Sequence, residues 1–225
     1  MEVKYHPIIF SAENVRATLE GRKTYARRVI KFPKRKGLGT DELMVYYPED
    51  AWAGTTIFGK HVLWVPNRHP DDPDVDNPAD FYGAYPISCP YGRVGDRLWV
   101  RESYMEIPCI DPTEDKLINY KADFQRNHSE WKWKPSIFMP RWASRITLEI
   151  VSIRAERLWN ISADDVNAEG IEPFDMGARS EFDVIDEDGL VAFYSKIWDS
   201  LNAKLGHPWD NNDWVWVIEF KRIDK

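Results

Sequence analysis

The sequence predicts a mixed α+β fold, built as a mixed sheet or a small β-barrel with a few peripheral helices. Short apolar stretches of strand length recur along the chain between turn residues. Helical periodicity is confined to a few short segments. Strands and helices do not alternate regularly, as they would in a doubly wound nucleotide-binding fold. With 225 residues, 43% of them apolar, the chain can bury one sizeable core, and we expect a single domain over residues 1–225.

The N-terminal elements are predicted from local signals. The apolar residues 8–10 fit a short buried strand. Ser11 can cap the free amides of a helix that runs to Glu20, and Gly21 fits the left-handed position that ends such a helix. A further strand is expected to begin at Val29.

The middle of the chain predicts strands around a long acidic loop. Two strands are expected at 43–47 and 61–65. Residues 66–90 are rich in proline and aspartate, so we expect an insertion there with little regular structure. Polar and apolar residues alternate over 97–102, as in a half-buried strand, and another short strand is expected at 118–120.

The C-terminal third predicts two strands and two helices. Clean alternation over 145–153 is typical of a central antiparallel strand. Ser162 predicts the start of a short helix that ends at Glu169. Residues 189–203 carry an apolar stripe at helical spacing, and 214–221 form a last strand with an aromatic and aliphatic face.

Several classes of function are disfavoured. The chain has neither a Gly-x-Gly-x-x-Gly motif nor a Gly-Lys-Ser phosphate loop, which argues against ATP-driven and dinucleotide chemistry. Its two cysteines, Cys89 and Cys109, form no Cys-x-x-Cys pair and read as ordinary thiols. We therefore predict no metal and no cofactor. The absence of a signal pattern or a membrane-length apolar run predicts a soluble, cytoplasmic protein.

A basic cluster stands out against an acidic chain. Residues 22–36 contain eight basic residues and no acidic one, whereas the whole chain has a net charge of −7. Such a local field favours an anionic ligand such as a nucleotide or an RNA phosphate. The net charge disfavours generic coating of DNA, so the contact is expected to be focal. The alternative is a solvated basic turn.

Residues 131–142 interleave tryptophans with lysines and an arginine. Aromatic rings beside cations are what a base-stacking and phosphate-holding surface needs. The alternative is that the tryptophans fill the core while the lysines face solvent.

Four segments together resemble a known family. They are Gly-Arg-Lys-Thr at 21–24 with Arg28, Gly-Asp-Arg-Leu-Trp-Val-Arg-Glu at 95–102, Trp-Lys-Pro-Ser-Ile-Phe-Met-Pro-Arg-Trp-Ala-Ser-Arg at 133–145, and Trp-Val-Ile-Glu-Phe at 216–220. As a set they resemble the ASCH domain, a PUA-like β-barrel, and especially its phage and prophage members. The resemblance extends from about residue 7 to residue 223.

The resemblance implies a barrel with a cleft for RNA or a pyrimidine nucleoside. Some small bacterial members are amidohydrolases that remove the acetyl group from N4-acetylcytidine with a lysine, a threonine and a glutamate; others are RNA-binding modules or ribonucleases. The family lysine falls on Lys23 and its glutamate on Glu169. The threonine position holds Ala26, although Thr24 or Tyr25 could supply a hydroxyl from the same turn.

The candidate catalytic residues are therefore Lys23, Thr24 and Glu169. Cations beside Lys23 disfavour its charged form and would free an amine for base or nucleophile work. The helix dipole at Glu169 disfavours a carboxylate and favours proton carriage. The alternatives are a phosphate-gripping lysine and an exposed helical glutamate.

A second set of residues is predicted to bind substrate or nucleic acid around the same cleft. Its members are Arg22, Arg27, Arg28, Arg101, Glu102, Arg141, Trp142 and Arg145. Trp142 would stack a base while the arginines hold phosphate or a carbonyl. The alternative is that Arg101 with Glu102, and Arg145 with Glu149, are cross-strand ion pairs.

Three functions follow as hypotheses. The first is an RNA- or modified-pyrimidine-nucleoside-binding protein that hydrolyses N4-acylated cytidine. The second is a noncatalytic RNA-binding module or a ribonuclease. The third is a phage protein that binds a host protein through the acidic insertion at 66–90, in the cytoplasm of a bacterium or a phage-infected host.

Overall fold

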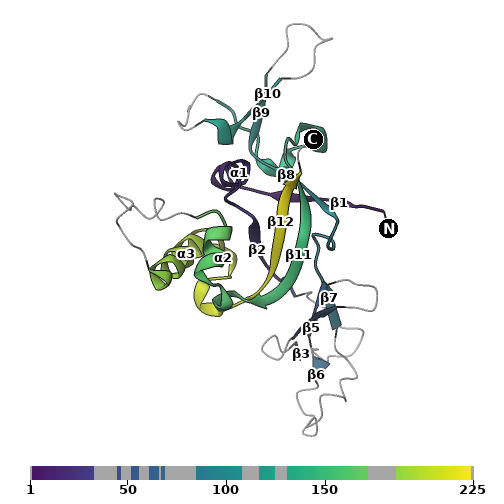
Figure 1. Cartoon of the computed structure of the whole chain (residues 1–225), viewed down its shortest axis with the longest axis vertical. Coiled ribbons are helices and arrows are strands. Elements are labelled where there is room, and N and C mark those ends of the chain that lie inside the picture. The colour runs from purple at the N-terminus through teal and green to yellow at the C-terminus, as the bar shows by residue number, and fades with distance from the viewer. Residues whose placement is uncertain are drawn as a thin grey trace.

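The fold is built on one five-stranded sheet. The computed structural model describes residues 2–32, 45–46, 52–55, 61–65, 67–68, 85–107, 117–124, 131–171 and 186–223. The sheet has the order β1-β8-β11-β12-β2 (Figure 1). Its strands are β1 (Tyr5–Ile9), β8 (Arg97–Arg101), β11 (Thr147–Arg157), β12 (Trp214–Ile223) and β2 (Tyr25–Val29). β1 runs parallel to β8 and the other pairs are antiparallel, so the predicted mixed α+β class is confirmed.

The sheet curls around a core of its own side chains. Alternate residues of all five strands, Ile8 of β1 and Ala26 of β2 included, belong to one buried apolar cluster. The two edge strands thus approach each other, and the Arg28 guanidinium donates a hydrogen bond to the Ile9 carbonyl at 2.9 Å. The predicted closed barrel is nevertheless wrong for the described residues, because no strand pairing joins β1 to β2 and the sheet stays open.

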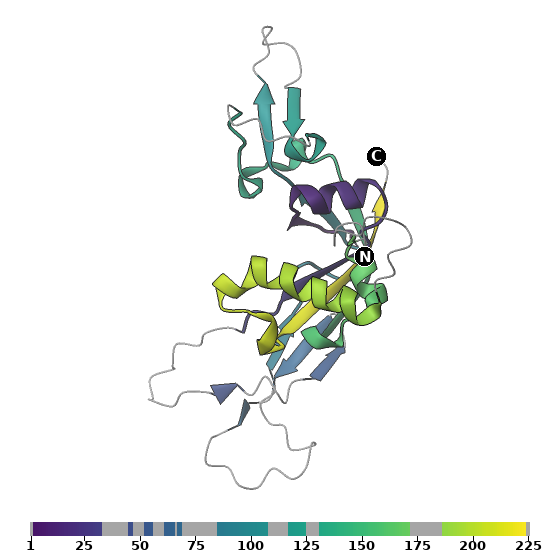
Figure 2. The same cartoon turned by 90° about the vertical axis from the view of Figure 1, so that its left-hand side faces the viewer.

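The central strand β12 is buried on both faces. Trp216 and Ile218 point into the curl of the sheet, as their alternation predicted. The opposite face, through Val215 and Val217, packs under α2 (Ala163–Ala168) and α3 (Glu187–Asn202). Figure 2 shows α3 lying across this side of the sheet. The helical stripe is confirmed at Leu190, Tyr194 and Trp198, but Leu201 in the last turn of α3 is exposed.

Helix ends follow their sequence signals closely. Ser11 caps α1 (Ala12–Leu19) by accepting from the Asn14 amide, and Gly21 has a φ of 81° just beyond its end. Ser162 and Asp165 form a reciprocal capping box at the start of α2. The predicted start of β2 at Val29 was wrong. The strand begins at Tyr25, which is also the first residue of β2 that pairs with β12.

Smaller sheets extend from the main one in opposite directions (Figures 1 and 2). One contains β9 (Tyr104–Ile107) and β10 (Leu117–Tyr120), and β10 confirms the short strand predicted at 118–120. The others contain β4 (Trp52–Thr55), β5 (His61–Val65) and β7 (Tyr85–Ser88), and β3 (Val45–Tyr46) with β6 (Asn67–Arg68). The 3-10 helices are η3 (Lys121–Asp123), η4 (Ser136–Phe138), η5 (Arg141–Ala143), η6 (Leu158–Asn160), η8 (Ala203–Leu205) and η9 (Trp209–Asn211).

Two predicted features fall largely outside the described residues. Within the acidic insertion at 66–90, the structure describes 67–68 and 85–90, which carry β6 and β7. The basic stretch continues beyond residue 32 into residues that are not described. None of the described helices is long and apolar enough to cross a membrane.

Candidate functional site

Lys23 and Glu169 form a buried pair although 146 residues separate them in the sequence. The Lys23 ammonium nitrogen, Nζ, lies 2.6 Å from Glu169 Oε2 and 2.8 Å from the Glu169 carbonyl oxygen. Lys23 is 3% exposed and Glu169 8%. Glu169 is therefore not the exposed helical glutamate of the alternative interpretation, and the two predicted catalytic residues are in direct contact.

The ends of two helices hold this pair in place. Beyond α1, the left-handed Gly21 lets the chain fold back, and the Lys23 amide donates to the Ala17 carbonyl at 3.0 Å. The next amide, that of Thr24, donates to the carbonyl of Ala168, the last residue of α2, at 2.8 Å. Glu169 follows as the C-cap residue of α2. The two side chains thus meet because backbone hydrogen bonds join their helix ends.

Arg27 fixes the Glu169 carboxylate from β2. Its backbone amide donates to Glu169 Oε1 at 2.8 Å, while its guanidinium reaches Glu156 and Asp165, each at 2.8 Å. The Arg27 side chain is 0% exposed. The sequence predicted that Arg27 binds a ligand, whereas in the structure its guanidinium is enclosed by carboxylates of this chain.

Burial sets the electrostatics of the lysine. Loss of water around the ammonium lowers the pKa of Lys23, and the charges of Arg28 and Arg27 lower it further, while the neighbouring Glu169 carboxylate opposes the shift. Nζ also lies 5.7 Å from the centre of the Phe10 ring. The pair places a proton donor and a proton acceptor in direct contact, which is an arrangement that acid–base chemistry requires.

Residue 26, where the resemblance places the hydroxyl, is an alanine. Ala26 is fully buried in the inner core, opposite Ile218 of β12. Thr24 is half-buried, and its carbonyl accepts from the Phe220 amide at 2.9 Å.

Sequence analysis missed Tyr194 of α3, which interacts electrostatically with Glu169, and treated it only as part of an apolar stripe. Burial first, and then the charge of Glu169, raises the pKa of Tyr194 well above its ordinary value.

Three other predicted binding residues form internal ion pairs. Arg22 contacts Glu20 and donates to the Gly170 carbonyl at 2.7 Å. Arg145 holds the buried Glu102 through two nitrogens, at 2.9 and 3.1 Å, and also contacts Asp123 at 2.8 Å. The expected partner of Arg145, Glu149, contacts Lys221 instead.

Burial raises the pKa of Glu102, and the adjacent Arg145 opposes that shift. Glu102 is 2% exposed, so its carboxylate is neutralised inside the protein and is not presented to a ligand. The alternative interpretation expected internal ion pairs here, but Arg145 pairs with Glu102 and not with Glu149, and both residues of the pair lie just outside β8 and β11.

The remaining predicted residues are Arg28, Arg101, Arg141 and Trp142. None of these three arginines forms an ion pair with a carboxylate in the ranges listed above. Arg101 and Arg141 lie on the outer side of β8, and Trp142 next to Arg141 is exposed. The predicted binding set therefore divides into residues that pair with charged groups of the described chain and arginines that do not.

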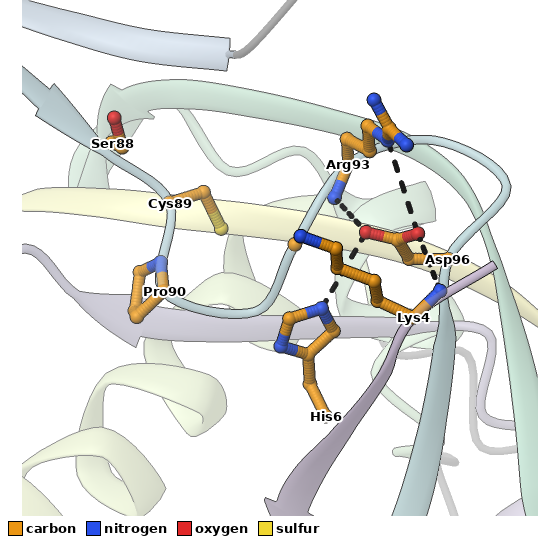
Figure 3. Close-up of a pocket in the computed structure, with 8 residues that line it drawn as sticks. Lys4, His6, Ser88, Cys89, Pro90, Arg93 and Asp96 are labelled. Atoms are coloured by element: carbon orange, nitrogen blue, oxygen red, sulfur yellow. Dashed lines mark hydrogen bonds and ion pairs between the residues drawn. The ribbon is translucent and has the colours of Figure 1, made fainter. Parts of the chain in front are cut away.

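A separate pocket of about 220 Å³ lies between β1 and the turn that precedes β8 (Figure 3). Sequence analysis did not predict this pocket. Asp96 accepts from the backbone amides of Lys4 and Arg93, and His6 Nε2 lies 3.5 Å from its carboxylate. Burial raises the pKa of the Cys89 thiol to about 11, which makes it a poor nucleophile at neutral pH. Neither Lys23 nor Glu169 lines this pocket.

Gly170, directly after the Glu169 cap of α2, lies very close to both α1 and Lys23. A Cβ atom there would lie 2.7 Å from Ala17 Cβ and 2.9 Å from Lys23 Cβ, at a φ of +84°. Gly170→Ala is therefore expected to lower the free energy of unfolding by about 2–3 kcal/mol, from left-handed strain plus overpacking. Urea unfolding would measure it. Gly21→Ala, with a similar φ of +81° and no atom within 4 Å, should lose only about 1 kcal/mol; equal losses would contradict the role of the contact.

Comparisons with protein-family models, with curated proteins and with solved structures found no match for the chain. The ASCH resemblance rests on the sequence motifs and stays a prediction.

Proposed function

We propose that this chain is an ASCH-type, PUA-like protein that binds RNA or a modified pyrimidine nucleoside and hydrolyses N4-acylated cytidine. The observation that carries the proposal is the buried contact between Lys23 and Glu169, at 2.6 Å. A lysine whose pKa is lowered by burial loses its proton more readily, and its neutral amine can act as a base or a nucleophile. A carboxylate in contact with it can carry the same proton onward.

The proposed reaction consumes one water. Lys23 in its neutral form takes a proton from water as the oxygen adds to the acyl carbon. The C–N bond then breaks, and the proton passes through Glu169 to the departing N4 amine. Cytidine and acetate are the products of N4-acetylcytidine. Arg27, through its backbone amide, keeps one carboxylate oxygen fixed while the other exchanges the proton.

The test is hydrolysis of N4-acetylcytidine, followed by mass-resolved chromatography of cytidine. We expect Lys23→Arg and Glu169→Gln to lower the rate at least about 100-fold, because the first keeps a cation that cannot lose its proton and the second cannot carry one. Asp164→Asn, at an exposed carboxylate of α2, should leave the rate unchanged.

The rate should rise with pH through the pKa of Lys23 and level off below 10.5, the ordinary value for lysine. Retained activity in Lys23→Arg would exclude the proposed role.

A noncatalytic RNA-binding module is the second candidate, and Ala26 favours it. The resemblance places a threonine there, whereas Ala26 is buried in the core. On this view Lys23 and Glu169 form only an internal ion pair. Wild-type protein that releases no cytidine but still retains RNA would support this candidate over the hydrolase.

A further inference from the structure

A ladder of cations and aromatic rings runs across the outer side of β1 and β8. The Arg97 guanidinium carbon lies 5.6 Å from the Tyr5 ring centre, and that of Arg141 lies 4.0 Å from the same ring. Arg141 is also 5.9 Å from the Trp99 ring, and Arg101 is 5.4 Å from it. Each ring therefore has two guanidinium groups within 6 Å of its centre. We call Tyr5, Arg97, Trp99, Arg101, Arg141 and Trp142 the outer β1–β8 face.

The strand register places these side chains on one surface. Tyr5 of β1 lies beside Arg97 of β8, and two residues further along the strands Pro7 lies beside Trp99. The intervening residue of β8, Leu98, is buried in the core inside the curl of the sheet. The ladder residues thus point away from the core. Arg141 reaches them from η5, which packs beside the strands.

The charges of this face are not neutralised by the protein. Arg97 donates to the Tyr5 hydroxyl and Arg101 to the Ile137 carbonyl, both of them uncharged acceptors. No carboxylate of the described ranges pairs with Arg97, Arg101 or Arg141. By contrast, Arg27 and Arg145 are enclosed by acidic partners. An acidic protein that leaves three adjacent arginines unpaired presents a local positive field suited to a polyanion.

The rings at this face are accessible. Tyr5 is 42% exposed and Trp142 is 56% exposed. Phe138, from the same segment as Arg141, is 69% exposed. Exposed aromatic rings can stack with the bases of a polynucleotide, and the guanidinium groups beside them can bind its phosphates. A duplex offers few free base faces, so the rings favour a single strand.

We infer that the outer β1–β8 face binds a single-stranded polynucleotide, with a base stacked on Trp142 and phosphates held by Arg97, Arg101 and Arg141. The inference deepens the proposed function, because it names the polymer and the surface that would hold it outside the Lys23–Glu169 pair. RNA is the polymer that the proposed function names.

The first measurement is fluorescence anisotropy of labelled 12-nucleotide uridine RNA, the matching thymidine DNA, and a 12-base-pair duplex. Saturable binding of a single strand below about 100 µM protein, several-fold tighter than that of the duplex, is expected. Preference between the RNA and the DNA strand identifies the natural form. Failure of both strands to bind, or equal binding of the duplex, overturns the inference.

Variants then locate the surface. Trp142→Ala should weaken single-strand binding about tenfold through loss of one stacked base. Arg141→Glu should weaken it at least tenfold and lower the slope of log affinity against log salt by about 1 to 2. The matched controls are Trp159→Ala, at an exposed tryptophan of η6, and Lys204→Glu, which makes the same charge change on η8. If the controls weaken binding as much as the face variants, the surface is wrongly assigned.

The two proposals can fail separately. Hydrolysis is measured on the free nucleoside with Lys23 and Glu169 variants, whereas strand binding is measured without turnover and with variants of the outer face. Cytidine release by wild-type protein that binds no strand would overturn the inference alone. Strand binding that depends on Arg141 and Trp142, in a protein that releases no cytidine, would overturn only the hydrolase proposal.

Discussion

Glu169→Ala is expected to lower the free energy of unfolding by about 3–5 kcal/mol. The carboxylate accepts from Lys23 Nζ and from the Arg27 amide, and both donors are buried. Without it, the Arg27 amide loses this acceptor, and the buried Lys23 ammonium keeps the backbone carbonyl of residue 169 but has no carboxylate to balance its charge. Such a loss is a large fraction of the stability of an ordinary domain. Urea unfolding followed by tryptophan fluorescence would measure it.

The matched control removes both charges and keeps an acceptor. In the double variant Lys23→Met with Glu169→Gln, no unpaired charge remains, and the side-chain amide oxygen introduced by the second substitution can still accept from the Arg27 amide. We expect this double variant to be more stable than Glu169→Ala by at least about 2 kcal/mol. If the double variant is as unstable as Glu169→Ala, the cost does not come from an unpaired Lys23.

Arg27→Met is expected to lower the free energy of unfolding by about 3–5 kcal/mol. Its guanidinium lies within 2.8 Å of Glu156 and of Asp165 and within 3.5 Å of Glu169. Removing it leaves three carboxylates close together, with charge repulsion and lost hydrogen bonds. We expect the loss to shrink at low pH, where protonation removes the repulsion, and urea unfolding between about pH 4 and pH 7 would show the trend.

Arg154 is the control for this prediction because it contacts two of the same carboxylates. It lies 2.8 Å from Glu156 and 3.3 Å from Asp165, but its side chain is 37% exposed. Water replaces its interactions, so Arg154→Met should cost only about 1 kcal/mol or less. Equal costs at Arg27 and Arg154 would show that burial does not set the strength of this network.

Local signals explain which parts of the fold were predictable. Ser11 and Ser162 marked helix starts because capping requires only a nearby amide, and Gly21 marked a helix end because a left-handed residue suits glycine. The alternation over 145–153 predicted a central strand, and β11 occupies that place. Lys23 and Glu169 could be proposed individually, but their contact depends on backbone hydrogen bonds between helix ends that no local pattern encodes.

Pairing between distant segments explains the errors. The start of β2 depends on its register with β12, and β12 is buried on both faces because α3 covers one of them. Barrel closure depends on whether β1 meets β2, which a list of strands leaves open. Arg27 and Arg145 looked like Arg28 and Arg141 in the sequence; only the positions of Glu156, Asp165 and Glu102 separate the paired arginines from the available ones.

The place of β12 in the sheet also constrains how the protein is made. This strand, Trp214–Ile223, lies between β11 and β2, so the N-terminal β2 has no strand partner in the main sheet until residues near 220 have left the ribosome. Synthesis at about 5–20 residues per second keeps the apolar surfaces of the earlier strands unpaired for some ten seconds or more. We therefore expect the main sheet to assemble late in translation, which makes the nascent chain a natural client for chaperones that shield apolar segments.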